Sequence, residues 1–142
     1  MAHAMSMLLP SAILTRLREQ ARAERPHECC GLLVGHTRSG HRQIVDAVPS
    51  ANLAPDSRTH GFLVDPNALA WALKCARALG GDIVGVYHSH PASDALPSRR
   101  DEQEATPEWA SVILGAKGDV RCWQRSGTGR ALYEEPIIEC PS

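Results

Sequence analysis

Apolar residues recur at helical spacing in two stretches of the chain, with polar residues on the faces between them. The first stretch ends before Pro26, because the residue before a proline disfavours the helical backbone. The second opens on Asp65–Pro66 and closes at Gly80–Gly81, which combine an N-cap, a first-turn proline and a C-terminal stop. The apolar positions are Ile13, Leu14, Leu17 and Ala21 in the first stretch and Leu69, Leu73, Ala76 and Leu79 in the second. The pattern predicts two amphipathic helices.

Shorter apolar runs, rich in β-branched residues, predict strands between and after these helices. They cover residues 28–36, 42–48, 62–64, 83–87, 111–116, 120–125 and 131–138. Residues 37–40 contain a glycine and join the first two runs as a hairpin loop. A third, short helix is predicted to begin at Ser98. This order of elements predicts an α/β fold with a mixed, mostly antiparallel sheet flanked by helices.

The bulk properties narrow the class of protein. A chain of 142 residues is expected to form a single domain, 1–142, with residues 1–6 outside its folded part. The net charge of −1 and the absence of a Lys/Arg stripe argue against nucleic acid or a membrane surface as partner. The apolar run after Met7 is interrupted by Pro10, which argues against a signal peptide. Five cysteines without a CxxC pair are typical of reduced thiols, and a cytoplasmic location is expected.

Candidate chemistry is concentrated directly after the run 83–87. Side chains alternate between the two faces of a strand, so Val84, Val86, His88 and His90 are expected on one face. Residues two apart on a strand are roughly 6.5–7 Å from one another, which lets two imidazoles turn toward one cation. Pro91 has no N–H and therefore ends the strand ladder.

Ser98 and Asp101 supply the next candidates. Serine followed three residues later by an acidic residue is a helix start, with the serine as N-cap. The first turn of that helix can aim Asp101 back at the strand end as a third, anionic ligand. Two histidines and one carboxylate suit zinc and leave a position open, as in catalytic sites. Asp94 is a rival ligand by chemistry, but its place between the histidines and Ser98 favours a loop role.

The spacing His88-x-His90-x7-Ser98-x2-Asp101, with a glutamate upstream, resembles the JAMM (MPN+) motif of zinc metallopeptidases. The upstream glutamate is Glu28, which enters an apolar run; the alternative, Glu24, lies in the first helix. The resemblance implies a deaminase-like α/β sandwich, Zn²⁺ held by the two histidines and Asp101, and amide hydrolysis. It implies that Glu28 accepts the proton of the attacking water as general base and that Ser98 donates a hydrogen bond to the oxyanion.

The resemblance also indicates a substrate. Compact prokaryotic JAMM proteins act on small ubiquitin-like (β-grasp) sulfur-carrier proteins, and the implied cut falls just after the C-terminal Gly-Gly, releasing cysteine or trimming a precursor. Asn52 and Arg58 lie in a loop that borders the substrate groove in this family and are candidate substrate contacts. The alternatives are an isopeptidase acting on conjugates of ubiquitin-like modifiers and a non-catalytic MPN-type scaffold; a homodimer is left open. A zinc nucleoside deaminase is disfavoured because the chain lacks a PCxxC ligand pair.

Overall fold

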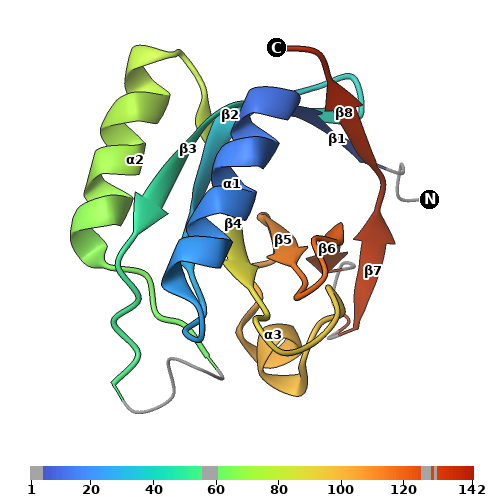
Figure 1. Cartoon of the computed structure of the whole chain (residues 1–142). Helices are drawn as coiled ribbons and strands as arrows, with labels where there is room; N and C mark the ends of the chain where they lie inside the picture. The colour runs from blue at the N-terminus through green and yellow to red at the C-terminus, as the bar shows by residue number, and fades with distance from the viewer. Residues whose placement is uncertain (1–4, 56–60, 126–128, 130) are drawn as a thin grey trace.

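The computed structural model describes residues 5–55, 61–125, 129 and 131–142, and these form one mixed sheet with three helices (Figure 1). The strand order is β7-β6-β5-β4-β2-β3-β1-β8. The strands are β1 (Ser6–Pro10), β2 (Cys30–Arg38), β3 (His41–Ser50), β4 (Asp82–Ser89), β5 (Ala110–Leu114), β6 (Val120–Arg125), β7 (Leu132–Glu135) and β8 (Ile137–Cys140). The helices are α1 (Ser11–Glu24), α2 (Pro66–Ala78) and α3 (Arg99–Glu104).

The pairing of the strands confirms the predicted fold class. β2 pairs antiparallel with β3 and β4, and β6 pairs antiparallel with β5 and β7. The pairs β1–β3, β1–β8 and β4–β5 are parallel. The sheet is therefore mixed and mostly antiparallel, with helices on both of its faces. No helix in the described part of the chain has the length and apolar character needed to cross a bilayer.

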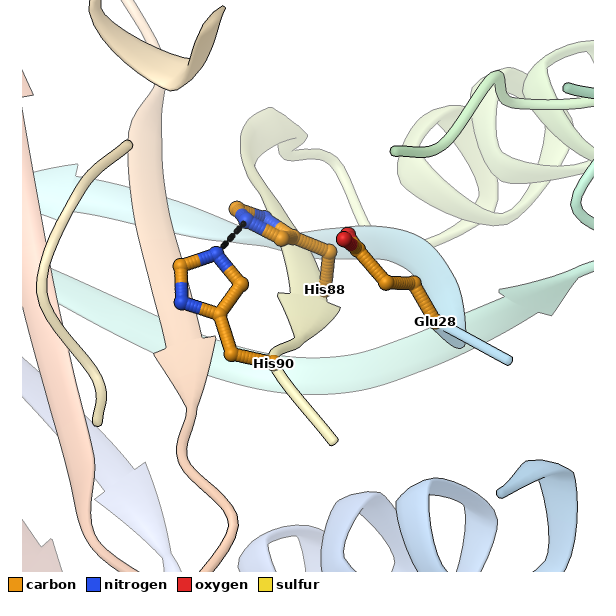
Figure 2. Close-up of side chains that lie close together, drawn as sticks. All are labelled: Glu28, His88 and His90. Carbon is orange, nitrogen blue, oxygen red and sulfur yellow. Dashed lines mark hydrogen bonds between the residues drawn. The ribbon is translucent and has the colours of Figure 1, made fainter. Parts of the chain in front are cut away.

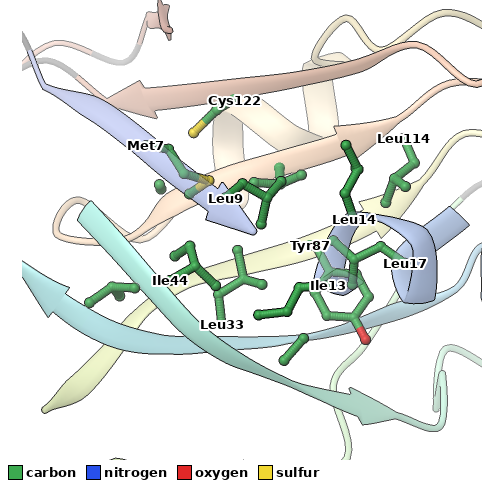
Figure 3. Close-up of a cluster of buried hydrophobic side chains, with 14 of the residues drawn as sticks. Met7, Leu9, Ile13, Leu14, Leu17, Leu33, Ile44, Tyr87, Leu114 and Cys122 are labelled. Atoms are coloured by element: carbon green, nitrogen blue, oxygen red, sulfur yellow. The ribbon is translucent and has the colours of Figure 1, made fainter. Parts of the chain in front are cut away.

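The two faces of the sheet carry separate hydrophobic clusters. α1 lies inside the curve of the sheet, where Leu14 and Leu17 pack with Leu33, Ile44 and Tyr87 (Figures 1 and 3). α2 covers the opposite face. That second cluster contains Leu32, Val34, Val48, Ala72, Ala76 and Ile83. α1 thus buries the apolar stripe that its sequence spacing predicts. The predicted stripe of α2 is only partly correct: Ala76 is buried and Leu69 half-buried, but Leu73 and Leu79, which follows the helix, are exposed.

The two edge strands follow one another directly in the chain. Only Pro136 separates β7 from β8, yet these strands lie at opposite ends of the strand order. The predicted single strand 131–138 is therefore wrong. Proline cannot donate to a ladder, and here it marks the point where the chain leaves one edge for the other. A buried ion pair, Arg42 Nε to Glu135 Oε1 at 3.1 Å, joins β3 to β7 across this curve.

Three further local predictions are corrected by the structure. β1 pairs with β3 and β8 although no strand is predicted there. Residues 62–64 make an isolated bridge, Asn52 with Val64, instead of a full strand. The register of β2 on β4 shifts between Leu33 and Val34. As a result, the Val84 side chain packs in the cluster around α1, on the opposite face of the sheet from Val86. A bulge of this kind inserts one extra residue and reverses the alternation before it.

Candidate active site

The C-terminal end of β4 places the two histidines in the interior of the molecule. His88 pairs with Cys30 of β2 and Ile113 of β5, so a strand lies on each side of it. The His90 N–H donates to the Leu114 carbonyl at 2.8 Å, which extends the pairing one step beyond the strand. Both side chains are buried, with 1% and 8% exposure. The central position in the sheet therefore holds both rings in fixed directions.

The start of α3 presents the carboxylate. Ser98 and Asp101 form the predicted capping box: the Asp101 N–H donates to Ser98 Oγ at 3.0 Å, and the Ser98 N–H donates to Asp101 Oδ2 at 2.9 Å. Such a reciprocal pair satisfies two of the free backbone N–H groups at a helix start. The serine and the aspartate are thereby locked to one another, and the carboxylate is directed at the histidines.

The three side chains meet in a small triangle of ligand atoms. His88 Nε2 lies 3.1 Å from His90 Nε2 and 3.2 Å from Asp101 Oδ1, and His90 Nε2 lies 3.1 Å from Asp101 Oδ2. Ligands about 2.0–2.1 Å from a tetrahedral zinc ion are about 3.3–3.4 Å apart, so the triangle matches one face of such a site. His90 Nδ1 lies 3.0 Å from the Asp94 carbonyl, which favours the tautomer with Nε2 free for a metal. Asp94 thus contributes its backbone, as a loop role predicts.

Burial and hydrogen bonding shift the pKa values of all three groups. Burial lowers the pKa of His88. At His90 burial acts in the same direction, but the hydrogen bonds to Asp101 and the Asp94 carbonyl outweigh it and raise the pKa. Burial also opposes the charge of Asp101, yet hydrogen bonds with the two histidines hold the pKa of that carboxyl well below its ordinary value. The shifts favour an ionised Asp101 and a neutral His88, which suit a divalent cation, whereas at His90 a cation has to displace a proton that Asp101 stabilises.

Glu28 lies beside the triangle without being part of it. Its carboxylate is within 4.8 Å of ligand atoms of both histidines, farther than Asp101 is, and its side chain points toward them (Figure 2). Only 6% of the residue is exposed. Burial raises the pKa of the Glu28 carboxyl to about 7, with His90 opposing the shift and Asp101 adding to it. Glu24, the alternative, accepts a hydrogen bond from Gln20 on α1 instead.

Asn52 holds the backbone around Glu28. Its amide nitrogen donates to the carbonyls of Glu28 and Gly61 at 3.0 and 2.9 Å, and its amide oxygen accepts from the N–H groups of Ala54 and Leu63. These four bonds use every donor and acceptor position of the amide. The contacts give Asn52 a positioning role, and its contact with substrate stays a prediction. Arg58, the other expected contact, lies outside the described residues.

An apolar groove of about 340 Å³ leads to the triangle. Its walls come from the segment 62–64, from β4, from α3 with the two residues after it, and from Trp109 with the start of β5. Phe62 stacks on the His88 ring with centroids 4.4 Å apart. The remaining lining residues are Leu63, Val64, Val86, Arg100, Asp101, Glu104, Ala105, Thr106, Trp109 and Ser111. No local pattern in the sequence indicates these wall residues, because they come together from four separate segments.

A sequence profile of prokaryotic homologs of the JAB domain matches residues 10–126. The chain belongs to this family. A desampylase of Haloferax volcanii is 34% identical over 117 residues, 82% of each chain. A probable TtuB-protein conjugate cleaving protease of Thermus thermophilus is 35% identical over 116 residues, 82% of this chain and 74% of the relative. The predicted resemblance to the JAMM proteins is confirmed at the level of the family.

Two further comparisons extend over more of the chain. A CysO-cysteine peptidase of Mycobacterium bovis is 25% identical over 134 residues, 92% of this chain and 89% of the relative. The solution structure of protein DSY2949 from Desulfitobacterium hafniense superposes with a TM-score of 0.83 at 28% identity, covering 96% of this chain and 94% of that one. The fold of this JAB-family chain is thus shared over nearly its whole length.

Proposed function

We propose that this JAB-family protein is a zinc peptidase that hydrolyses the amide bond after the C-terminal Gly-Gly of a small ubiquitin-like sulfur-carrier protein. The observation that carries the proposal is the triangle of His88, His90 and Asp101 with Glu28 beside it, at the end of an apolar groove. The names of the relatives, a desampylase, a conjugate-cleaving protease and a CysO-cysteine peptidase, support peptidase chemistry on a carrier protein.

Each polar residue has a distinct role in this proposal. His88, His90 and Asp101 would hold the zinc, which in such sites activates water and polarises a carbonyl. Glu28, with a pKa of about 7, takes up a proton from water at neutral pH and returns it to the departing amine. Ser98 Oγ accepts a hydrogen bond from the backbone N–H of Asp101. The Ser98 O–H donates to no described group, so it can donate a hydrogen bond to the developing oxyanion.

The groove supports a substrate that enters as an extended tail. The Leu63 N–H donates to Asn52 Oδ1, and the Leu63 carbonyl accepts from the Leu53 N–H, so both backbone groups of Leu63 face residues 52 and 53. Neighbouring residues of an extended segment point their backbone N–H and C=O groups to opposite sides. Among the described residues, the backbone groups of Phe62 and Val64 have no hydrogen-bond partner, so they can pair with a tail added as a strand. The tail must pass close to the Phe62 ring and the end of α3. Glycine residues, which lack a side chain, meet that restriction.

A second candidate is cleavage of isopeptide-linked conjugates. The relatives above 30% identity are named for desampylation and for cleaving a protein conjugate, whereas the CysO-cysteine peptidase is named for a terminal cysteine. Both reactions cut an amide after a carrier tail and use the same residues here. They differ only in the leaving amine. A cytoplasmic location and a homodimer stay predictions.

One panel of substrates separates the candidates. Mass spectrometry would follow three forms of a Gly-Gly carrier with zinc-loaded enzyme: one ending in an added cysteine, one with several added residues, and one joined through a lysine side chain. We expect cleavage directly after Gly-Gly, abolished in Glu28→Gln. Preference for the first two forms supports the peptidase, and preference for the third supports the isopeptidase. Unchanged masses for all three, together with cleavage of unrelated peptides, would overturn the carrier assignment.

A further inference from the structure

A second cavity, of about 300 Å³, lies where the C-terminal half of α1 meets the turn between β5 and β6. Its charged lining consists of Arg18, Arg22 and Arg25 from α1 and the residue after it, and Lys117 from the turn. We call these four residues the basic cluster. All four are exposed, and no carboxylate lines the cavity within the part of the chain that the structure describes. The charged residues that line this cavity are therefore all cationic, although Lys117 also lines a neighbouring cavity with Asp94 and Asp119.

The side chains of the basic cluster form no ion pair in the described part of the chain. Among the described residues, no carboxylate pairs with any of its members within 4.0 Å, although Arg16 on the same helix pairs with Asp46. Carboxylates are not scarce, because the chain has 15 Lys and Arg and 16 Asp and Glu residues. Like charges four residues apart, such as Arg18 and Arg22, destabilise a helix by a few tenths of a kcal/mol. A cation in the last turn of a helix is favourable, which accounts for Arg22 but not for Arg18 or for Lys117 in the turn between β5 and β6.

Backbone carbonyls hold two of the arginines at the cavity. Arg18 donates from Nε and Nη2 to the Gly118 carbonyl at 3.2 and 3.0 Å. Arg25 donates from Nη2 to the Ala116 carbonyl at 2.6 Å. A guanidinium has five N–H donors, so each arginine keeps donors for an anion while its direction is fixed. Cations held in advance lose less side-chain entropy on binding than free ones do.

A short series of backbone bonds connects the basic cluster to the active site. Ala116, whose carbonyl holds Arg25, donates its N–H to the Ser93 carbonyl at 2.8 Å. The Ser93 N–H donates to the His90 carbonyl at 3.4 Å. Figure 1 shows the C-terminal end of α1 at the same end of the molecule as α3, which carries Asp101. The cluster thus adjoins the active site, while none of its members lines the apolar groove.

We infer that the basic cluster docks an acidic face of the protein substrate while the substrate's tail occupies the groove; this inference rests on the proposed function. The number of cations favours a protein surface over a small anion. The cluster has four exposed cations from a helix and a turn, and two of its guanidinium groups are already bonded to the carbonyls of Gly118 and Ala116. Several acidic side chains on a folded partner match this number. Recognition of the body and chemistry on the tail would then use separate surfaces.

The test measures binding without turnover. The Glu28→Gln protein would be titrated with a Gly-Gly carrier of acidic surface, and the dissociation constant followed from low to high salt. The charge reversal Arg22→Glu/Lys117→Glu changes two cluster members whose side chains make no described hydrogen bond to the rest of the chain. Lys74→Glu reverses an exposed charge on α2, which covers the other face of the sheet. Unfolding curves confirm that every variant is folded, and Arg22→Lys should bind as the parent does.

We expect the double reversal to weaken binding about 10-fold or more at low salt, with the difference nearly lost at about 0.5 M salt, where charges are screened beyond about 4 Å. Lys74→Glu should leave the dissociation constant unchanged. Equal affinity and equal salt dependence for the double reversal and Lys74→Glu would overturn the docking surface even if carriers are cleaved. Absence of saturable binding by every acidic carrier would overturn it as well. Salt-dependent binding without cleavage by the parent enzyme would instead reject the proposed function and keep the docking surface.

Discussion

The substitution Glu28→Gln tests the proposed general base most directly, because it keeps the size of the side chain and removes only its proton chemistry. Glu28 lies outside the triangle of His88, His90 and Asp101. Metal content should therefore remain at the parent level. Hydrolysis of the carrier amide should fall by about 10²–10⁴, the usual contribution of a positioned base. Metal analysis and rate measurements on the same preparation separate these two effects.

The same substitution should change the pH dependence of stability in the metal-free protein. Burial raises the pKa of Glu28 from 4.5 to about 7. Below pH 4.5 Glu28 holds its proton in both the folded and the unfolded chain. As the pH rises toward 7, Glu28 releases the proton first in the unfolded chain, so the free energy of unfolding of the parent protein falls. A difference of about 2.5 pKa units corresponds to at most about 3 kcal/mol, and screening at the groove reduces this to about 1–2 kcal/mol. The Glu28→Gln variant escapes this loss because an amide side chain does not ionise.

Denaturant unfolding of both proteins in the presence of a chelator, at about pH 4.5, 6 and 8, measures this effect. The free energy of unfolding of Glu28→Gln should rise relative to the parent by about 1–2 kcal/mol between the first and last pH. A difference that stays constant with pH would show that burial does not raise the free-energy cost of ionising Glu28 in the folded protein. Parent-level hydrolysis by Glu28→Gln would assign the base to another residue, and Glu24 would be tested next.

Four further predictions concern binding, rate and stability. His88→Ala/His90→Ala should lose the metal, because only one of three ligands remains; full occupancy by metal analysis contradicts the ligand set. Ser98→Ala should keep the metal but lower kcat about 10²–10³-fold, because a hydrogen bond to the oxyanion is lost. The free energy of unfolding of this variant should drop by about 1 kcal/mol because a helix cap is lost. An unchanged kcat would show that Ser98 takes no part in the reaction. Asn52→Ala should lower the free energy of unfolding by about 1–3 kcal/mol and also lower the rate of hydrolysis, since backbone groups lose their hydrogen-bond partners. Asn52→Asp keeps only the acceptor, so both quantities should lie between those of the parent and of Asn52→Ala. Arg42→Met should cost about 3–5 kcal/mol because it strands a buried carboxylate, and denaturant unfolding that matches the parent would contradict a buried pair.

Local rules explain the parts of the site that the sequence predicts correctly. A serine N-cap with an acidic residue three positions on forms its capping box through bonds within one turn, so Ser98 and Asp101 could be placed without knowledge of the fold. Alternation along a strand likewise puts His88 and His90 on one face. The helix limits followed from Pro26, Asp65 and the glycines after α2. These features depend on neighbours within a few residues.

Contacts between distant segments decided what the sequence left open. Glu28 reaches the histidines because β2 pairs with β4 and Asn52 holds the backbone ahead of that strand, three segments that no spacing rule connects. The bulge that turns Val84 inward depends on the register between those strands.

The parallel strand β1, the split of one expected strand at Pro136 and the basic cluster also arise only in the folded chain. The physical reason is the same in each case. Period and capping act through bonds within a turn or a strand, whereas register, curvature and the meeting of surfaces depend on which distant backbone groups find one another. The types of the candidate ligands and their local spacing can be read from the sequence. Only the pairing of distant strands makes these side chains face one another beside a groove and a cationic surface.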